Sequence, residues 1–476
     1  MSRSSTEQRS LKSGQIGTWG IFFMVISAAA PLTVVAGSFP PAYAFGGIGV
    51  AGAMVFAGLV LMAFASGFTA MGRYVKNAGA FFAYAGKGLG KPIGVGVSFV
   101  TILSYVVLSI SFYGLIGFFG NLTAGIVFGA DIPWWVFSIV TLLAIFILGR
   151  RQVEIGAKLL AVLLTAEVLV VIVLVVAIMV QGGPEPISFA PLDPANALLA
   201  PGAGILLVFA FGAFLGFEGT AVYAEEARNA ERSIPRATYG AVAFLALFYA
   251  VAAFAFAYGF GVEGIIGFVT TEDFTALPYA MASTFVGDWL VNTMFILIVT
   301  SFFACLLAFH NASARYMFSL GRERILPSAL AKVAPSGAPV VANTVLVALA
   351  AVAIVATIVT NGDPYATLAI GTYAAGTSGL VFAQALASMS VLAFFLRDRR
   401  GHNVWRVLVF PLLGAAGLIF GWVSIVTNFD ILTGWGAESN VWLIAAAPLL
   451  LTAGIVWALI IKARDPKRYS GLIATN

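Results

Sequence analysis

Residues 20–37 read GIFFMVISAAAPLTVVAG, and residues 204–227 read GILLVFAFGAFLGFEGTAVYAEEA. Both stretches are apolar enough to cross a membrane, yet each carries residues that interrupt a helix near its middle. Pro31 removes a backbone donor and clashes with the preceding turn, whereas Gly212 and Gly216 let the backbone open and approach a ligand. Irregular backbone at membrane depth is found only where it is buried in protein or lines a cavity. We therefore predict two broken helices beside a binding site, with an ordinary proline kink and glycines for helix packing as the alternative.

The composition predicts that lipid is the solvent for most of the surface. Aliphatic and aromatic residues make up 61% of the 476 positions, whereas charged residues make up only 9%. A soluble protein of this size needs a charged surface, and this chain has too few charges to cover one. The polar N-terminus shows no signal peptide, so we expect the first span to direct insertion. The single cysteine, Cys305, lies in an apolar run, so neither a disulfide framework nor a metal cluster is expected.

Apolar runs of about the length that crosses a bilayer predict twelve membrane-spanning helices. They lie at about 17–45, 49–72, 92–121, 133–149, 155–180, 202–224, 235–260, 286–314, 339–361, 366–395, 404–427 and 441–462. No soluble domain fits between any two of them. We expect an all-α integral membrane protein with one domain over 17–462, between an N-terminal tail (1–16) and a C-terminal tail (463–476).

The basic residues provide an independent test of this number of spans. If the N-terminus is cytoplasmic, all 25 Lys and Arg residues fall in segments on the cytoplasmic side, that is, in tails, loops and the adjoining span ends. The six outer loops contain none of them, but carry acids such as Asp131, Glu263 and Glu438. Cytoplasmic loops of membrane proteins are enriched in Lys and Arg, and one span more or fewer would reverse every later loop. The pattern predicts twelve spans with both termini in the cytoplasm.

The two broken spans occupy corresponding positions in the chain. They are the first and sixth spans, so each begins a group of five helices. Interrupted helices in corresponding positions of two halves are typical of transporters that are built from inverted repeats. We expect one repeat over about 17–180, the second over about 202–395, and two additional helices over about 404–462.

Four motifs support a resemblance to a known family. They are SAAAPLT (27–33), VKNAGAFFAYAGKGLG (75–90), FGAFLGFEGTAVYAEEARNAERSIPRA (211–237) and HNASARYMFSLGRERILP (310–327). On these motifs the chain resembles the amino acid–polyamine–organocation (APC) transporters over nearly its whole length. The resemblance implies a LeuT-like fold of 5+5 inverted repeats with two additional helices, and a substrate site at the breaks in spans one and six. Many amino acid permeases of that family carry a Gly-Ser-Gly-like triplet where this chain has Ala28, Ala29 and Ala30, which leaves the identity of the substrate open.

The expected site follows from the ends of the half-helices. The outer half of span one begins near Pro31, where free amides and a positive dipole end attract a carboxylate. Its inner half ends near Ser27, where free carbonyls suit an ammonium. Span six runs the opposite way, so it offers carbonyls near Phe211 and amides near Gly216. A zwitterion matches this arrangement. The candidate substrate-binding residues are Ser27, Ala28, Ala29, Ala30, Thr33, Phe209, Phe211, Gly212, Phe214 and Gly216.

Phenylalanines are a further candidate lining. Phe209, Phe211, Phe214 and Phe217 lie in the sixth span, and we expect two of the four to line the site. For any one of them, a place in the core or against lipid is the commoner role.

Two acids lie deep within the predicted spans, Glu167 in span five and Glu218 in span six. A carboxylate in hydrocarbon is unfavourable unless it is protonated, paired or hydrated, so we predict coupling or gating roles, with helix packing as the alternative. The resemblance adds that Glu218 matches the acid of the span-six motif. It also places Glu167 beside the region used for ion coupling, where some relatives have a lysine. A proton is the expected coupling ion, with sodium as the alternative.

Charged residues are dense where the chain leaves span six. They are Glu225, Glu226, Arg228, Glu231, Arg232 and Arg236, and they form either a solvated loop or a cytoplasmic gate. His310 and His402 lack neighbouring metal ligands in the sequence, so structural roles are expected for both.

The function expected from these features is secondary active transport of amino acids or closely related amines across the plasma membrane. We expect alternating access with proton-coupled import. The alternatives are a putrescine-like polyamine importer, an amino acid exchanger and, in a different class, a channel. No clustered catalytic set points to an enzyme, and the phosphate-binding motif of an ATP-driven pump does not occur. The expected partners are a small-molecule substrate and the lipid bilayer, with no cofactor, metal or nucleic acid.

Overall fold

The computed structural model describes residues 14, 16–75, 79–150 and 153–473. Within these residues the regular structure is helical, apart from one isolated bridge between Ile16 and Ala227. Eleven helices of the described chain are long and apolar enough to cross a membrane. A shorter apolar helix, Trp134–Leu148, stands where the fourth span was predicted. The prediction of an all-α membrane protein is confirmed, and each of the twelve predicted spans corresponds to a helix.

The first broken span comprises α1 (Thr18–Ala29), α2 (Pro31–Thr33) and α3 (Phe39–Pro41), and the second comprises α9 (Ala203–Ala213) and η6 (Phe217–Ala221). The other spans are α4 (Val50–Met71), α6 (Lys91–Phe128), α7 (Trp134–Leu148), α8 (Val153–Gln181), α10 (Ala230–Phe260), α13 (Asp288–Arg322), α14 (Val340–Val359), α15 (Gly371–Arg397), α16 (Phe410–Thr427) and α18 (Ala437–Arg464). Short helices connect them: α5 (Phe81–Gly88), α11 (Val262–Thr271), α12 (Leu277–Phe285), α17 (Phe429–Thr433) and α19 (Pro466–Gly471).

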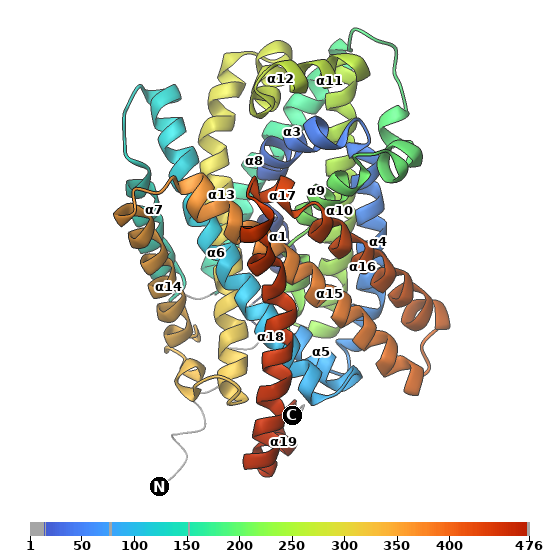
Figure 1. The fold of residues 1–476 in the computed structure, drawn as a ribbon, viewed down its shortest axis with the longest axis vertical. Helices are drawn as coiled ribbons and strands as arrows, with labels where there is room; N and C mark the ends of the chain where they lie inside the picture. Colours follow the sequence, from blue (N-terminus) through green and yellow to red (C-terminus); the bar gives the residue numbers. More distant parts are fainter. Residues whose placement is uncertain (1–13, 15, 76–78, 151–152, 474–476) are drawn as a thin grey trace.

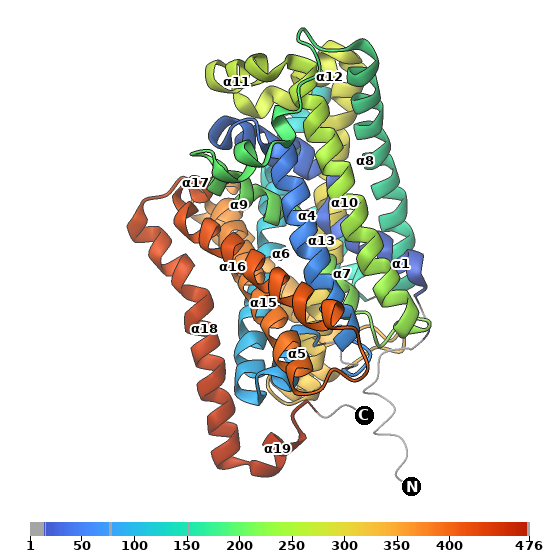
Figure 2. The same ribbon diagram turned by 90° about the vertical axis from the view of Figure 1, so that its right-hand side faces the viewer.

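The broken helices lie at the centre of the bundle. α1 packs against α8, α10 and α13, whereas α9 packs against α4 and α16. α11 and α12 cover one end of the molecule, and α5 and α19 lie at the other (Figure 1). α8 and α18 stand on opposite sides (Figure 2). Apolar side chains on the periphery are open, with Val162 and Val352 each 69% exposed, as expected where lipid covers the surface.

Several spans are longer than predicted, and α6 and α13 are the longest of them. α6 runs from Lys91 to Phe128 and α13 from Asp288 to Arg322. The 38 residues of α6 extend over about 57 Å, whereas a hydrocarbon core is about 30 Å thick, so these helices continue beyond it. The prediction stopped where the apolar run stopped, although the helix does not. The added turns of α13 carry Arg315 and Arg322, which contribute to the gate described below.

Candidate functional site

The first span breaks at Ala30. This residue has a φ of 46°, in the left-handed region, and it separates α1 from α2. Pro31 follows directly, and its ring disfavours a helical conformation of the residue before it. Side chains from other spans bond the last carbonyls of α1. Cys305 Sγ donates to the Ala28 carbonyl at 2.9 Å, and the Tyr249 hydroxyl donates to the Ala29 carbonyl at 3.3 Å. The predicted break in span one is confirmed.

The second break directly contacts the first. Gly216 has a φ of 103°, and a Cβ added there would lie 2.5 Å from the Ala28 Cβ, so only glycine fits. The inner half of span six differs from the prediction. Instead of a regular half-helix, the chain forms the 3-10 segment η6 followed by turns up to α10. Three glycines between 212 and 219 weaken the helix there, and a side chain replaces the missing helical bonds.

That side chain is Glu218, which is 1% exposed. Its Oε2 accepts hydrogen bonds from the Gly216 backbone N–H at 3.0 Å and from Gln384 Nε2 at 3.1 Å. Its Oε1 accepts a longer one from the Tyr105 hydroxyl at 3.4 Å. The amide of Gly216, which we expected to be open to a substrate, is therefore bonded to a carboxyl group of the chain itself.

The other buried acid has a parallel position at the first break. Glu167 on α8 is 1% exposed and accepts a hydrogen bond from Ser301 Oγ at 2.7 Å. Ser301 Oγ also lies 3.1 Å from Thr33 Oγ1, at the start of the outer half of span one. Each half-helix start that was predicted to offer free amides thus has an acidic side chain of this chain beside it, Glu167 through Ser301 and Glu218 directly.

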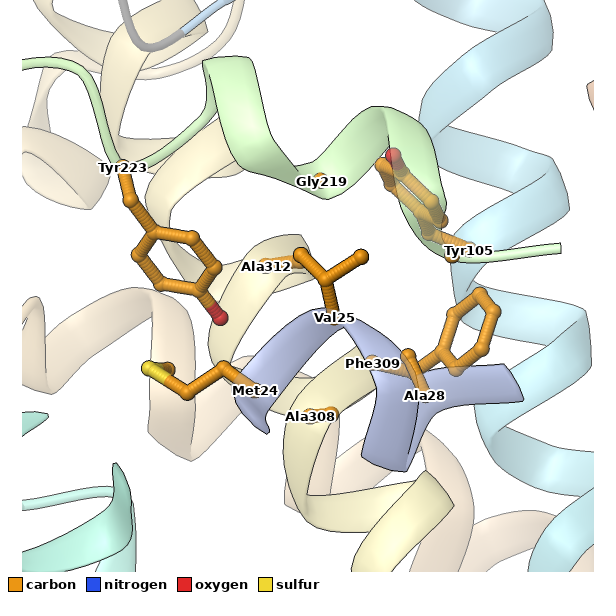
Figure 3. Close-up of a pocket in the computed structure, with 10 residues that line it drawn as sticks. Met24, Val25, Ala28, Tyr105, Gly219, Tyr223, Ala308, Phe309 and Ala312 are labelled. Carbon is orange, nitrogen blue, oxygen red and sulfur yellow. The ribbon is translucent and has the colours of Figure 1, made fainter. Parts of the chain in front are cut away.

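A small cavity lies at the junction of the breaks. Its volume is about 10 Å³, roughly the room that one water molecule needs, so this conformation is closed around the site. α1 lies between the span-six segment and α13 (Figure 3). Tyr105 and Tyr223 approach the cavity from opposite ends. The lining residues are Met24, Val25, Ala28, Tyr105, Gly216, Gly219, Tyr223, Ala308, Phe309 and Ala312.

Ala28 and Gly216 are the two predicted substrate-binding residues that line this cavity. The others lie nearby or elsewhere. Ala29 and Ala30 form the break, and Ser27 Oγ donates to the Leu160 carbonyl at 3.4 Å. Gly212 faces Tyr373, whose hydroxyl would lie 3.5 Å from an added Cβ.

None of the four phenylalanines in span six lines the cavity of this conformation. Phe214 packs against Tyr249, with ring centroids 5.8 Å apart, and Phe217 packs against Phe64 at 5.7 Å. Phe211 lies against Gly421, and Phe209 is half-buried. They pack between helices, the role that is commoner for apolar side chains, because span six is surrounded by other spans.

A layer of ion pairs closes the end of the molecule that carries α5. Arg315 on α13 bonds to the Glu226 carboxylate, with the Nη2 to Oε1 distance at 3.1 Å, and its guanidinium lies 5.3 Å from the Tyr223 ring centroid. Arg322 donates to both oxygens of Glu225, at 2.9 and 2.6 Å. These pairs join the exit of span six to span eight, and we call them the gate pairs.

The chain near its N-terminus reinforces this closure. The Ile16 N–H donates to the Glu226 carbonyl at 3.2 Å, and the Arg228 N–H donates to the Ile16 carbonyl at 2.8 Å. Arg228 Nε also donates to the Gly14 carbonyl at 2.9 Å. The segment that enters α1 is thereby held against the exit of span six.

Several of these residues were missed by the sequence analysis. Ser301, Gln384 and Tyr105 are neutral residues on three different spans, and no sequence pattern marks them as partners of an acid. Arg315 and Arg322 had a detectable signal, because a spacing of seven places both on one face of a helix. The expected structural roles of the histidines agree with their contacts: His310 bonds to Asn343, and His402 bonds to the Tyr74 hydroxyl at 2.9 Å.

Two interrupted helices in corresponding positions, with buried acids at the breaks and a charged closure at one end, define a secondary transporter of the inverted-repeat class. The chain belongs to the amino acid permease family, whose model matches residues 16–461.

Curated relatives agree with this membership, and a solved structure shares the fold. The chain is 24% identical over 398 residues to the low-affinity putrescine importer PlaP of Escherichia coli strain K12, covering 80% of this chain and 82% of the relative. The values for the importer of the same name in Escherichia coli O157:H7 are equal. A crystal structure of an Eremococcus coleocola manganese transporter, in complex with an aromatic bis-isothiourea substituted compound, has a TM-score of 0.58 at 11% identity. It covers 98% of this chain and 99% of its own, which supports the transporter fold.

Proposed function

We propose that this transporter imports a small aliphatic amine without a carboxylate, by proton-coupled alternating access. The observation that carries the proposal is the hydrogen bond from the Gly216 amide to Glu218. A substrate carboxylate would need that amide, which the chain's own carboxyl already occupies. Glu218 itself remains available as the counter-charge of an ammonium group.

The remaining groups around the breaks suit a cation. The carbonyls of Ala28 and Ala29 lie at the end of α1, and they accept hydrogen bonds from side chains of other spans. Tyr105, Tyr223 and Phe309 line the cavity, and aromatic faces attract ammonium groups. The nearest basic side chain described above is Arg315, and it is paired with Glu226. An amine therefore finds acceptors here, whereas a carboxylate finds no free cation.

The relatives suggest which amine the substrate is. PlaP is described as a putrescine importer, and putrescine is a diamine that carries no carboxylate. We propose putrescine or a similar diamine as the substrate. A zwitterionic amino acid is the second candidate, because the family model describes amino acid permeases. That substrate would require Glu218 to release the Gly216 amide as the substrate binds.

The proposed orientation follows from charge. The gate pairs lie in segments that also contain Arg228, Arg232 and Arg324. In contrast, Glu263 lies in the first turn of α11 and Glu438 in the first turn of α18, toward the opposite end of the molecule (Figure 1). Because Lys and Arg accumulate in cytoplasmic segments, we propose that the gate pairs close the cytoplasmic side and that both termini are cytoplasmic. The plasma membrane is the proposed location, and import is the proposed direction.

Coupling is assigned to Glu167. This acid joins span five, span eight and the first break through Ser301 and Thr33, so its protonation state can alter contacts on all three elements. An ionised carboxylate without a cationic partner is unfavourable at this depth, so the group is expected to be neutral for part of the cycle. Proton binding in one facing state and release in the other would link the proton gradient to substrate movement.

The Glu167→Gln variant tests the proposed coupling. Proteoliposomes with the membrane potential held at zero by potassium and valinomycin should accumulate labelled putrescine when the outside is made acidic. The variant keeps the shape and fixes the neutral state, so it should exchange substrate at equal pH but lose this accumulation. Glu438→Gln, the same change at an exposed acid, should behave as the wild type.

Two results would contradict the assignment. If Glu167→Gln still accumulates putrescine with the wild-type pH dependence, Glu167 is structural. If a sodium gradient alone drives wild-type uptake at constant pH, proton coupling is wrong for every acid of the chain.

A further inference from the structure

A surface hollow of about 440 Å³ lies between the beginnings of α1 and α10, away from the substrate site. Thr18, Trp19 and Phe22 of α1 line one side, and Arg236 and Gly240 of α10 line the other. The two helices pack against each other along this seam. In the proposed orientation, the hollow lies at the cytoplasmic surface of the membrane. The site described above does not use any of these residues.

The basic residues beside the hollow have no partner within the described part of the chain. Arg232 and Arg236 are both exposed, and neither guanidinium group forms a hydrogen bond or ion pair with a described residue. Their spacing of four places them on one side of α10, one turn apart. Glu231, the acid next to Arg232, lines a different hollow together with Arg73 and Tyr84. Two guanidinium groups without a partner among the described residues thus lie one helical turn apart beside the hollow.

An apolar strip continues from the hollow along α10. Trp19 is 71% exposed and contacts Phe22 edge-on, with ring centroids 5.4 Å apart. Phe22 in turn lies 6.1 Å from Phe244, which stacks on Phe248 at 5.4 Å. Leu247 on the same stretch of α10 is 68% exposed. The strip begins with an indole, the ring that is enriched at membrane interfaces, and continues with purely apolar side chains.

We propose that this hollow binds an anionic phospholipid, with its phosphate on Arg232 and Arg236 and an acyl chain along the aromatic strip. Guanidinium groups bind phosphate with two parallel hydrogen bonds, and basic sites between spans on the cytoplasmic side are suited to anionic lipid heads. A soluble anion would use the arginines but not the strip. A phospholipid uses both, because its charged head binds the arginines while the acyl chain joined to that head lies along the adjacent aromatic strip.

The position of the lipid has a consequence for the cycle. α1 is the inner half of the broken first span, and an opening on the cytoplasmic side requires α1 to move relative to its neighbours. A lipid that contacts α1 and α10 together stabilises the closed arrangement. Binding itself does not depend on the proposed substrate, so it can be tested without transport.

The test compares lipid binding by the purified full-length protein. Native mass spectrometry should show that dioleoylphosphatidylglycerol is retained in preference to dioleoylphosphatidylcholine. The Arg232→Gln/Arg236→Gln variant should lose about tenfold or more of that preference. The matched control is Arg399→Gln/Lys467→Gln, which removes two exposed cytoplasmic charges elsewhere and should keep it. Gel filtration should show that both variants are folded and monodisperse.

Three outcomes would overturn the proposal. The wild type could show no preference for the anionic lipid. Both double variants could lose the preference equally, which would show a diffuse charge effect. Millimolar glycerol 3-phosphate could displace the lipid, which would show a site for a soluble anion instead of a lipid.

Discussion

The Glu218→Gln variant is expected to bind putrescine roughly 30- to 1000-fold more weakly than the wild type. A hydrogen bond to a charged group contributes about 1.5–3 kcal/mol, and loss of one partner of a buried charge pair costs about 2–5 kcal/mol. Each 1.4 kcal/mol corresponds to about tenfold in affinity. Glutamine has the same shape and can still accept the Gly216 N–H, so the variant removes the charge and leaves the break in place.

Equilibrium binding of labelled putrescine to the purified variant measures this effect. Glu263→Gln, the same substitution at an exposed acid of α11, is the control and should bind like the wild type. A thermal melt establishes that the Glu218 variant is folded. Unchanged affinity in a folded Glu218→Gln protein would show that the substrate does not use this carboxyl group.

Breaking the gate pair between Arg315 and Glu226 should open the cytoplasmic side. Both side chains are nearly inaccessible, at 3% and 4%, so Arg315→Met leaves an unpaired buried carboxylate. Removal of one partner of a buried pair costs about 3–5 kcal/mol, enough to invert a balance between two conformations of similar energy. We expect the variant to favour the inward-open state and to lose substrate accumulation.

The single cysteine reports this opening. Cys305 is 2% exposed and bonded to the Ala28 carbonyl at the first break. In inside-out vesicles it should be protected from an impermeant thiol reagent in the wild type and react quickly in Arg315→Met. Arg399→Gln is the control, because it removes an exposed charge outside the gate pairs.

A charge exchange separates opening from misfolding. The variant Arg315→Glu/Glu226→Arg restores an ion pair at the same place and should recover part of the protection of Cys305. If Cys305 stays protected in a folded Arg315→Met protein, the pair does not hold the cytoplasmic side closed.

The span count and the breaks were predictable because each has a local cause. A proline in mid-span disfavours a continuous helix, and the Lys and Arg residues are confined to one of the two sides. Pro31 and Gly216 therefore marked the breaks before any contact was known. Charge segregation also fixed the number of spans, including the short α7, which is below the usual length for a membrane helix.

The side chains that bond to Glu218 were not predictable from the sequence. Glu218 bonds to Gln384, 166 positions away, and to Tyr105, 113 positions away. Such contacts depend on helix packing, and a neutral residue carries no pattern that reveals its partner. The expectation of a free amide at Gly216 was wrong for this reason. It assumed that the start of the half-helix is exposed, whereas Glu218 bonds to it.

The gate was partly predictable. The acidic members, Glu225 and Glu226, were recognised as a possible gate in the sequence. Their partners were missed, because the apolar run of span eight ends before Arg315 whereas α13 continues to Arg322. A rule based on hydrocarbon thickness cannot detect turns of a helix that extend beyond the hydrocarbon core.

The central claim is that the chain's own carboxyl groups occupy the half-helix starts, so that the site receives an amine without a carboxylate. The most direct measurement is the binding of putrescine and ornithine to the same purified protein, because ornithine is putrescine with one added carboxylate. The account predicts that ornithine binds about tenfold or more weakly than putrescine. If ornithine, or a neutral amino acid such as alanine, binds more tightly than putrescine, the half-helix amides receive a substrate carboxylate and the central claim is wrong.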